Sequence, residues 1–368
     1  MEPMPDPSDR TADVVIIGAG QAGLAVAYHL GRRGLALGED VLVLDRGPGP
    51  GGAWQHRWES LTLGGTHHLH DLPGMAETGL SFASAPGDVP ARALVPSYYG
   101  TYEERHGIEV LRPVTVTNVS RTVDGYSVSA APGSAVERVH ARVVVSATGT
   151  WTSPRVPFVP GREHFQGRQL TTADFSSAAE LAGLRVAVVG GGTSALTFLD
   201  EVGDVADEVL WFTRRPPTFH DEEIELSPER GRVAVAIQDD AARAGRPLPS
   251  IVSVTGLPRS PLVRRLEAAG RLERMPMFAQ MTADGVVTRE GATIPVDAVI
   301  WATGFRPEIA HLRPLGVVGE DGGIVVEDGR VPAEPGLFLA GYGPQASTLS
   351  SNRAARVTAK AITDLLVR

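Results

Sequence analysis

The chain of 368 residues contains no cysteine. It therefore has no disulfide bond, no thiolate metal ligand, no iron–sulfur cluster and no cysteine nucleophile. Thiol–disulfide exchange needs a thiolate, so every reaction that passes electrons through a pair of protein thiols is excluded as well. A redox enzyme with this sequence must release its electrons by another route.

Long hydrophobic runs and a strong positive charge are also missing. The apolar runs near residues 14–17, 143–147 and 298–302 are far shorter than the roughly 20 residues that cross a bilayer. The first residues, MEPMPDPSDRTAD, lack the positive start and the apolar stretch of a secretion signal, so we expect a cytoplasmic location. The net charge of −9 disfavours nucleic acid and membrane surfaces as partners.

Glycine and proline, in contrast, are plentiful. The chain has 42 glycines and 28 prolines, which indicates many turns between short elements. Its length exceeds the size at which a single core keeps growing, so we expect two domains. The sequence leaves the oligomeric state open, with a homodimer as the candidate because dimers are the commonest soluble oligomers.

The first glycine-rich turn follows an apolar strand. Residues 13–17 (DVVII) predict a strand, an alanine-rich helix runs to Arg33, and VLVLD ends a second strand at Asp45. Gly18 allows a tight turn, Gly20 lets a pyrophosphate approach the backbone, and Gly23 lets the helix pack closely. The helix amino terminus favours an anion, and Asp45 is placed to accept hydrogen bonds from ribose hydroxyls. This unit predicts a dinucleotide such as FAD.

A second copy of the pattern begins at residue 185. RVAVVG ends in a turn that contains Gly190 and Gly192, with Ala195 at the third position, and Thr193 and Ser194 open the next helix. The second strand of this unit ends in Arg214 and Arg215 rather than in an acid. An arginine pair binds a 2′-phosphate with charge-assisted bonds, which favours NADPH, with NADH as the alternative. The other interpretation is that both arginines belong to a solvated strand end.

The two copies predict an α/β fold with two Rossmann-like dinucleotide-binding domains. We assign residues 1–155 and 303–368 to a discontinuous FAD-binding domain and residues 156–302 to an inserted NAD(P)H-binding domain. FAD and NADPH are the predicted cofactors, since a nicotinamide that delivers hydride to a flavin completes a half-reaction.

Several motifs resemble the flavin-containing monooxygenases, in particular their short bacterial forms, which have a glutathione-reductase-like fold. The motifs are GAGQAG (18–23), GGAW (51–54), ATG (147–149 and 302–304), GGGTSA (190–195), ATGFRP (302–307) and GLFLAGYG (336–343). The resemblance implies that Gly51, Gly52 and Trp54 help to hold the FAD and that the two ATG phrases join the domains. It adds cofactor-site candidates in those phrases and before the last helix: Thr148, Gly149, Thr303, Gly304, Gly341 and Gln345. That helix would direct its amino end at the flavin pyrimidine.

The sequence departs from this family at one motif. The family has a histidine in F-x-G-x-x-x-H, but the sequence FQGRQLT places Thr171 there, which puts the coupling of NADPH oxidation to oxygenation in question. The asparagine that many relatives place near the reactive flavin carbon is not evident in residues 60–74. Thr66 and His67 are the nearest polar candidates, so Thr66, His67 and Thr171 are the candidate catalytic residues.

Oxygenation is the predicted outlet for the electrons. NADPH would reduce FAD, oxygen would be activated at the flavin C4a carbon, and one oxygen atom would pass to a small sulfur or nitrogen nucleophile or to a ketone. The alternatives are an NAD(P)H-dependent reductase or oxidase with a quinone or a carrier protein as acceptor, and a nucleotide-sensing protein without turnover. We expect no metal site at His67, His68, His70 and Asp71, because adjacent histidines usually point apart. The serines of STLSSNR (347–353) are expected to cap a helix.

Overall fold

The computed structural model describes residues 9–66, 69–221, 228–249 and 256–367. The chain divides into two compact units. Unit 1 comprises Met1–Gly149, Ala236–Leu248 and Pro307–Arg368, and unit 2 comprises Thr150–Val235 and Pro249–Arg306. Residues 236–248, which lie in the range expected for the nicotinamide domain, therefore group with unit 1.

Unit 1 is built on an eight-stranded sheet with the order β17-β18-β6-β1-β2-β3, to which the hairpin β4–β5 is added through β6. The run β18-β6-β1-β2-β3 is parallel throughout, whereas β17 pairs antiparallel with β18. The strands are β1 (Asp9–Ile17), β2 (Val41–Leu44), β3 (Val110–Leu111), β4 (Val116–Thr122), β5 (Gly125–Ala130), β6 (Arg138–Ser146), β17 (Arg330–Val331) and β18 (Glu334–Leu339).

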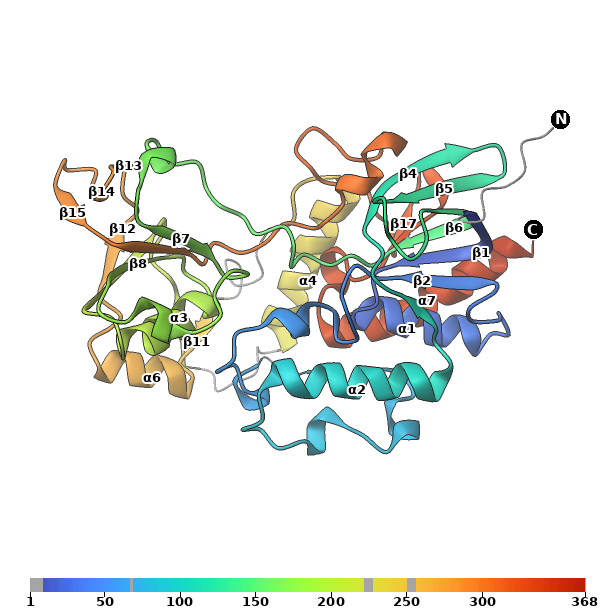
Figure 1. Cartoon of the computed structure of the whole chain (residues 1–368), viewed down its shortest axis with the longest axis horizontal. Helices are drawn as coiled ribbons and strands as arrows, with labels where there is room; N and C mark the ends of the chain where they lie inside the picture. Colours follow the sequence, from blue (N-terminus) through green and yellow to red (C-terminus); the bar gives the residue numbers. More distant parts are fainter. Residues whose placement is uncertain (1–8, 67–68, 222–227, 250–255, 368) are drawn as a thin grey trace. The chain divides into compact units, whose positions relative to one another are not determined.

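Both faces of this sheet are covered, which explains why its strands read as unbroken hydrophobic runs. Val14 and Ile16 of β1 pack toward helices α1 (Gln21–Gly31), α2 (Ala91–His106) and α7 (Thr348–Leu366). Val15 and Ile17 pack toward β4, β5 and the short helix η7 (Ala310–Leu315). Figure 1 shows α1 and α7 side by side under β1 and β2, with the β4–β5 hairpin on the other face.

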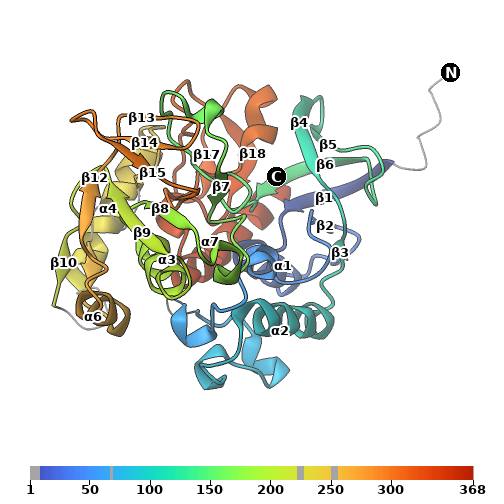
Figure 2. The ribbon, with the colours of Figure 1, turned by 60° about the vertical axis from the view of Figure 1, so that its left-hand side comes forward.

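Unit 2 contains a parallel five-stranded sheet with the order β12-β9-β8-β16-β7 (Figure 2). Helix α3 (Thr193–Gly203) packs on α6 (Pro261–Ala268), and a small antiparallel sheet of β13, β14 and β15 completes the unit. The strands are β7 (Arg168–Thr171), β8 (Arg185–Val189), β9 (Glu208–Thr213), β10 (Phe219–His220), β11 (Leu257–Pro258), β12 (Arg274–Pro276), β13 (Gln280–Met281), β14 (Gly285–Val287), β15 (Thr293–Pro295) and β16 (Ala298–Trp301).

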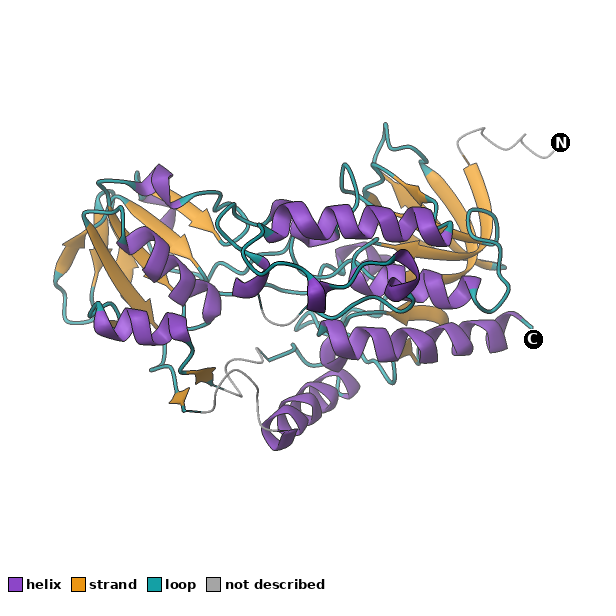
Figure 3. Ribbon diagram, turned by 90° about the horizontal axis from the view of Figure 1, so that it is seen from below, coloured by secondary structure: helices purple, strands orange, loops and turns teal. Residues whose placement is uncertain are grey.

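The remaining elements are mostly single turns, apart from α4 (Pro228–Arg243), whose residues from 236 onward belong to unit 1. The 3₁₀ helices are η1 (Gly52–His56), η2 (Leu63–Gly65), η3 (Met75–Thr78), η4 (Phe82–Ser84), η5 (Arg162–His164), η6 (Ala178–Leu181) and η8 (Gly343–Gln345). Figure 3 shows that each unit contains both helices and strands. The predicted α/β class with two Rossmann-like sheets is confirmed.

The two units repeat the same local arrangement. In unit 1, β1 ends beside β6, with Ile17 opposite Ser146. In unit 2, β8 ends beside β16, with Val189 opposite Trp301. Each pair is followed by a glycine turn on one strand and an ATG phrase on the other. Two equivalent turns therefore lie at the carboxyl ends of the sheets, where ligands of open α/β folds bind.

None of the helices in the described part of the chain is both long enough and apolar enough to span a membrane.

Candidate functional site

The first glycine turn is closed by backbone contacts that leave no room for side chains. Gly18 has a φ of +105°, and a Cβ there would lie 2.5 Å from the carbonyl oxygen of Ala147. A Cβ on Gly23 would lie 1.9 Å from the carbonyl oxygen of Gly18. Both positions therefore require glycine, one for its backbone conformation and the other for close packing of α1 on the turn.

Gly20 differs, because the space above it is open. It precedes the first residue of α1, and no atom lies within 4 Å of the position that its Cβ would take. No side chain caps this helix end, and the first turn contains no acidic residue. The end therefore offers backbone N–H donors to an anion, which suits a pyrophosphate.

Two further glycine segments approach the same helix end. A Cβ on Gly52 would lie 3.0 Å from the Cα of Gly20, and a Cβ on Gly341 would lie 3.0 Å from the Cβ of Ala22. Segments far apart in the sequence thus meet around the first turn of α1. Their small residues leave the backbone accessible, as a bound dinucleotide requires.

Asp45 follows β2 and is 6% exposed. Its carboxylate accepts hydrogen bonds from the backbone N–H groups of Ala19 (2.8 Å) and Gly47 (2.7 Å). An ionised carboxylate has about four acceptor positions, so two remain for ribose hydroxyls. Arg112 lies 3.8 Å from this carboxylate and is itself held by two hydrogen bonds to Glu103. No motif in the sequence indicates this arginine.

The GGAW segment is followed closely by another arginine, Arg57. The guanidinium of Arg57 lies 5.2 Å from the ring centroid of Trp54, within the range of a cation–π contact. Burial lowers the pKa of Arg57 to about 10. A partly buried cation beside a proposed flavin site was not predicted from the sequence, although Arg57 follows Trp54 by three residues.

Gln21 joins four segments through its side-chain amide. Its Nε2 donates to the carbonyl oxygen of His70 (3.3 Å) and to Oδ1 of Asn352 (2.9 Å), and its Oε1 accepts a hydrogen bond from the hydroxyl of Tyr99. Asn352 in turn donates to the carbonyl oxygen of Asp71 (2.6 Å). The loop of His70 and Asp71 is therefore fixed to the amino ends of α1 and α7.

The segment before His70 contains two candidate catalytic residues, Thr66 and His67. The Thr66 hydroxyl donates to the carbonyl oxygen of Leu63 (2.6 Å), a local bond that stabilises its own turn. His67 and the neighbouring His68 lie outside the described residues. The Asp71 carboxylate accepts from Ser81 and from the N–H of Phe82. Within the described parts of the chain, no three histidine or acidic side chains form a group that could hold a metal ion.

The first ATG phrase is anchored within unit 1. The Thr148 hydroxyl donates to the carbonyl oxygen of Glu308 (2.5 Å), and the N–H of Glu308 donates to the carbonyl oxygen of Gly149 (2.9 Å). Beside them, Nε2 of His311 lies 3.1 Å from the hydroxyl of Ser146. Burial lowers the pKa of His311 to about 4, so the imidazole is neutral at pH 7.

The segment before α7 contains the helix cap and the candidate cofactor residue Gln345. Ser347 caps α7 by accepting a hydrogen bond from the N–H of Ser350 (3.1 Å), which confirms the expected capping role. Gln345 lies toward Gly329, since a Cβ on that glycine would lie 3.2 Å from the Gln345 amide nitrogen. Its amide oxygen is buried, and no group in the described residues donates to it. The place of Gln345 in a cofactor site stays a prediction.

The second glycine turn repeats the geometry of the first. Gly190 has a φ of +149°, and a Cβ there would lie 2.2 Å from the carbonyl oxygen of Ala302. Gly192 precedes α3, which starts with Thr193 and Ser194, and its Cβ position is open to at least 4 Å. Ala195 is fully buried. This helix end has the same donors and the same free space as that of α1.

A third arginine, from the neighbouring strand, lies at the end of β9 beside the two that the sequence indicated. Arg214 and Arg215 are exposed and directly follow the strand. Arg274, at the start of the neighbouring β12, donates from Nη1 to the Thr213 hydroxyl (3.0 Å). Arg274 lies about 60 residues away in sequence, so spacing alone could not have revealed it.

Thr171 occupies a turn at the end of β7. Its N–H and its hydroxyl both donate to Oδ2 of Asp174 (2.8 and 2.7 Å), and the N–H of Ala173 donates to the Thr171 hydroxyl (3.2 Å). These bonds stabilise the turn. In the second ATG phrase, the Thr303 hydroxyl donates to the carbonyl oxygen of Arg155, and the N–H of Arg155 donates to the carbonyl oxygen of Gly304 (2.8 Å).

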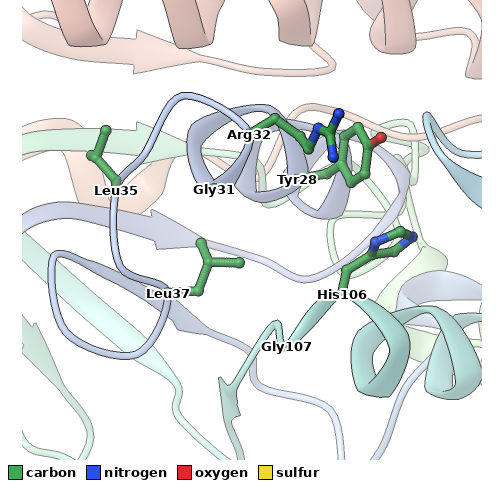
Figure 4. A pocket seen from close by; sticks show the side chains of 7 residues that line it. All are labelled: Tyr28, Gly31, Arg32, Leu35, Leu37, His106 and Gly107. Atoms are coloured by element: carbon green, nitrogen blue, oxygen red, sulfur yellow. The ribbon is translucent and has the colours of Figure 1, made fainter.

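A cavity of about 340 Å³ lies at the other end of α1, between Arg32, Leu35, Leu37 and His106 (Figure 4). Two of its polar side chains have partners: the Tyr28 hydroxyl donates to Glu77 (3.0 Å), and His106 Nε2 lies 3.2 Å from the carbonyl oxygen of Gly74. Burial is the main cause that raises the pKa of Tyr28 and lowers that of His106. Because α1 is roughly 15 Å long, this cavity is separate from the glycine turn.

Comparisons with known proteins agree with this geometry. Residues 15–239 match the family model described as pyridine nucleotide-disulphide oxidoreductase. A flavin-containing monooxygenase from Stenotrophomonas maltophilia superposes with a TM-score of 0.79 at 34% identity, over 97% of this chain and 99% of that one.

Two curated relatives also match over most of their length. An uncharacterized oxidoreductase, CzcO, from Bacillus velezensis is 24% identical over 89% of this chain and 91% of its own. A ferredoxin–NADP reductase from Thermus thermophilus is 26% identical over 92% and 85%. The resemblance seen in the sequence is thus confirmed. The chain belongs to the pyridine nucleotide-disulphide oxidoreductase family and, within it, to the flavin- and NAD(P)H-dependent monooxygenases.

Proposed function

We propose that the chain is an FAD-containing monooxygenase that takes hydride from NADPH and transfers one oxygen atom of O2 to a small sulfur or nitrogen nucleophile or to a ketone. The observation that carries the proposal is the pair of equivalent glycine turns, each with an open helix end. A protein with one catalytic nucleotide would need only one such turn. The cytoplasmic location expected from the sequence and the candidate homodimer stay predictions.

The residues of unit 1 suit the FAD part of this proposal. The helix end at Gly20, with Gly52 and Gly341 beside it, would hold the pyrophosphate, and the Asp45 carboxylate would bind the ribose. The bonds from Ala19 and Gly47 to Asp45 orient its carboxylate before the cofactor arrives, which lowers the entropic cost of binding. When bound, the flavin supplies the redox chemistry by accepting hydride and reacting with oxygen.

The residues of unit 2 suit the nicotinamide donor. The helix end at Gly192 would hold its pyrophosphate, and Arg214 and Arg215 would neutralise the 2′-phosphate that distinguishes NADPH from NADH. Phosphate carries about −1.5 to −2 charges near neutral pH. An exposed arginine pair at the strand end therefore favours the phosphorylated nicotinamide.

The absence of cysteine restricts where the electrons go next. Transfer of electrons through protein thiols to a disulfide substrate is excluded. Oxygen, a quinone or a carrier protein remain as electron acceptors. The Thr171–Asp174 turn, in place of the expected histidine, favours the second candidate, an NAD(P)H-dependent reductase that does not oxygenate. The similarity to the Thermus reductase supports the same alternative.

The experiment that separates these candidates measures whether the two electrons of NADPH end in oxygenated product, in hydrogen peroxide or in a reduced quinone. The purified flavin-loaded protein is supplied with NADPH and air-saturated buffer together with an aryl methyl sulfide, a tertiary amine or a cyclic ketone. We expect oxygenated product to account for a large share of the NADPH consumed with at least one class of substrate. Stoichiometric hydrogen peroxide without product, together with rapid reduction of a quinone, would instead identify a reductase.

A further inference from the structure

Thr213 lies between the glycine turn of unit 2 and an arginine from another strand. It is the last residue of β9 and is only 2% exposed. Its Cγ2 lies 3.9 Å from the position that a Cβ would take on Gly191. Its hydroxyl accepts the hydrogen bond from Nη1 of Arg274 (3.0 Å). The Arg274 guanidinium is thereby held at the end of β9, beside the glycine turn.

This bond is not needed to join the two strands. Strands β9 and β12 already pair in parallel from Trp211–Arg274 to Thr213–Pro276, and the N–H of Met277 donates to the carbonyl oxygen of Thr213 (3.0 Å). Arg274 is opposite Trp211, so its side chain reaches two residues along β9 to meet Thr213. The hydroxyl therefore orients a guanidinium whose other N–H donors remain available.

The arginines at this strand end also differ from others of unit 2. Arg168, Arg185, Arg259, Arg265 and Arg271 each pair with a carboxylate. In the described residues, no carboxylate pairs with Arg214, Arg215 or Arg274. Three arginines thus lie at the end of β9 without a carboxylate partner among the described residues, which favours a multiply charged anionic ligand.

We propose that Arg274 is a third ligand of the NADPH 2′-phosphate, held in position by Thr213. The inference rests on the proposed function, in which unit 2 binds NADPH. Arg214 and Arg215 are exposed and have long flexible side chains, so they lose conformational entropy when they bind. Arg274 is partly buried and already oriented. It therefore contributes selectivity for the phosphate at a smaller entropic cost.

Binding of nucleotide fragments tests this without flavin turnover. The affinities of 2′,5′-ADP and 5′-AMP for the flavin-loaded protein are measured by calorimetry for wild type and for Arg274→Gln. We expect Arg274→Gln to weaken 2′,5′-ADP binding about tenfold or more, as for the loss of a charge-assisted bond. Its 5′-AMP affinity should stay within about twofold. The control is Arg265→Gln, which removes the same charge from α6 and should change neither affinity.

Thr213→Val gives a second, milder variant. It keeps the guanidinium and removes only its acceptor, so 2′,5′-ADP binding should weaken by a few fold, again without an effect on 5′-AMP. Equal losses for both ligands, or none for either, would overturn the assignment of Arg274. If the wild type itself binds 2′,5′-ADP and 5′-AMP equally well, the proposed preference for NADPH is wrong, and so is the role proposed for Arg274.

Discussion

At the scale of single residues, the described part of unit 1 contains a histidine that burial keeps uncharged. His311 is 4% exposed, and Glu308, which would favour its charged form, only partly offsets the loss of hydration. The hydrogen bond to Ser146 fixes its ring beside the first ATG phrase. A neutral imidazole that is protonated only at about pH 4 links the stability of this region to pH.

The sign of this dependence follows from the lowered pKa. Between about pH 6.5 and pH 4, the unfolded chain binds a proton at residue 311 and the folded chain does not. The free energy of unfolding should therefore fall as the pH falls through this window, by at most about 3 kcal/mol from this residue. Below about pH 4, the pKa of His311 in the folded protein, this residue should cause no further fall in the free energy of unfolding.

His311→Gln should remove that contribution while keeping a hydrogen-bonding group near Ser146. Urea unfolding of the flavin-free protein at pH 7 and at pH 5 measures the difference, and the same exchange at the exposed His164 is the control. If the free energy of unfolding falls from pH 7 to pH 5 by the same amount in His311→Gln as in the wild type, the His311 imidazole does not cause the pH dependence.

At the scale of elements, Gln21 determines how α1, α2 and α7 meet. Its amide uses both N–H groups and its oxygen, so its orientation is fixed by three bonds. Tyr99, which donates to it, has a fully buried ring. A buried hydroxyl without an acceptor costs about 1–3 kcal/mol, so the three partners should depend on one another.

Gln21→Leu should therefore destabilise unit 1 by about 1–3 kcal/mol, because it leaves the Tyr99 hydroxyl and Asn352 without this partner. Tyr99→Phe should cost about 1 kcal/mol. The double variant should be more stable than the sum of the two losses implies, since phenylalanine no longer needs the acceptor. Free energies from urea unfolding complete the cycle, and strictly additive losses would contradict a shared bond.

The sequence revealed those elements whose pattern is local. The glycine turns, β1, β2, β8, β9 and α7 were predicted because apolar runs and glycines repeat at short spacing. Helix α2 was not predicted, since Pro96 argues against a helix in the sequence, although α2 continues through it, and its buried residues are spread among polar ones. Helix α4 was missed in the weakly patterned segment 216–280.

The same distinction holds for the site. Gly18, Gly20 and Asp45 were found from the spacing of one motif. Asn352 lies 331 residues from Gln21, and Arg274 lies on a different strand from Thr213, so only folding brings these pairs together. Contacts between distant segments leave no periodic signal in a single sequence.

At the scale of the whole molecule, the same strand, glycine turn and helix end occur once in each unit. In each unit, a parallel strand pair ends in a glycine whose Cβ would collide with the carbonyl of an ATG alanine. In each, the next helix begins at a glycine with open space above it. Because the two turns belong to separate compact units, each should lose its ligand independently.

Two matched substitutions test this independence. Gly20→Ala and Gly192→Ala each add a methyl group where no atom lies within 4 Å, and both glycines have extended backbone angles that alanine adopts. Each unit should therefore keep its fold, while the methyl group occupies the space that a phosphate needs. We expect Gly20→Ala to lose FAD and still bind 2′,5′-ADP, and Gly192→Ala to stay yellow and bind 2′,5′-ADP at least about tenfold more weakly. Flavin absorbance and calorimetry on both variants measure the two effects, and loss of both ligands in either variant would contradict the independence of the two turns.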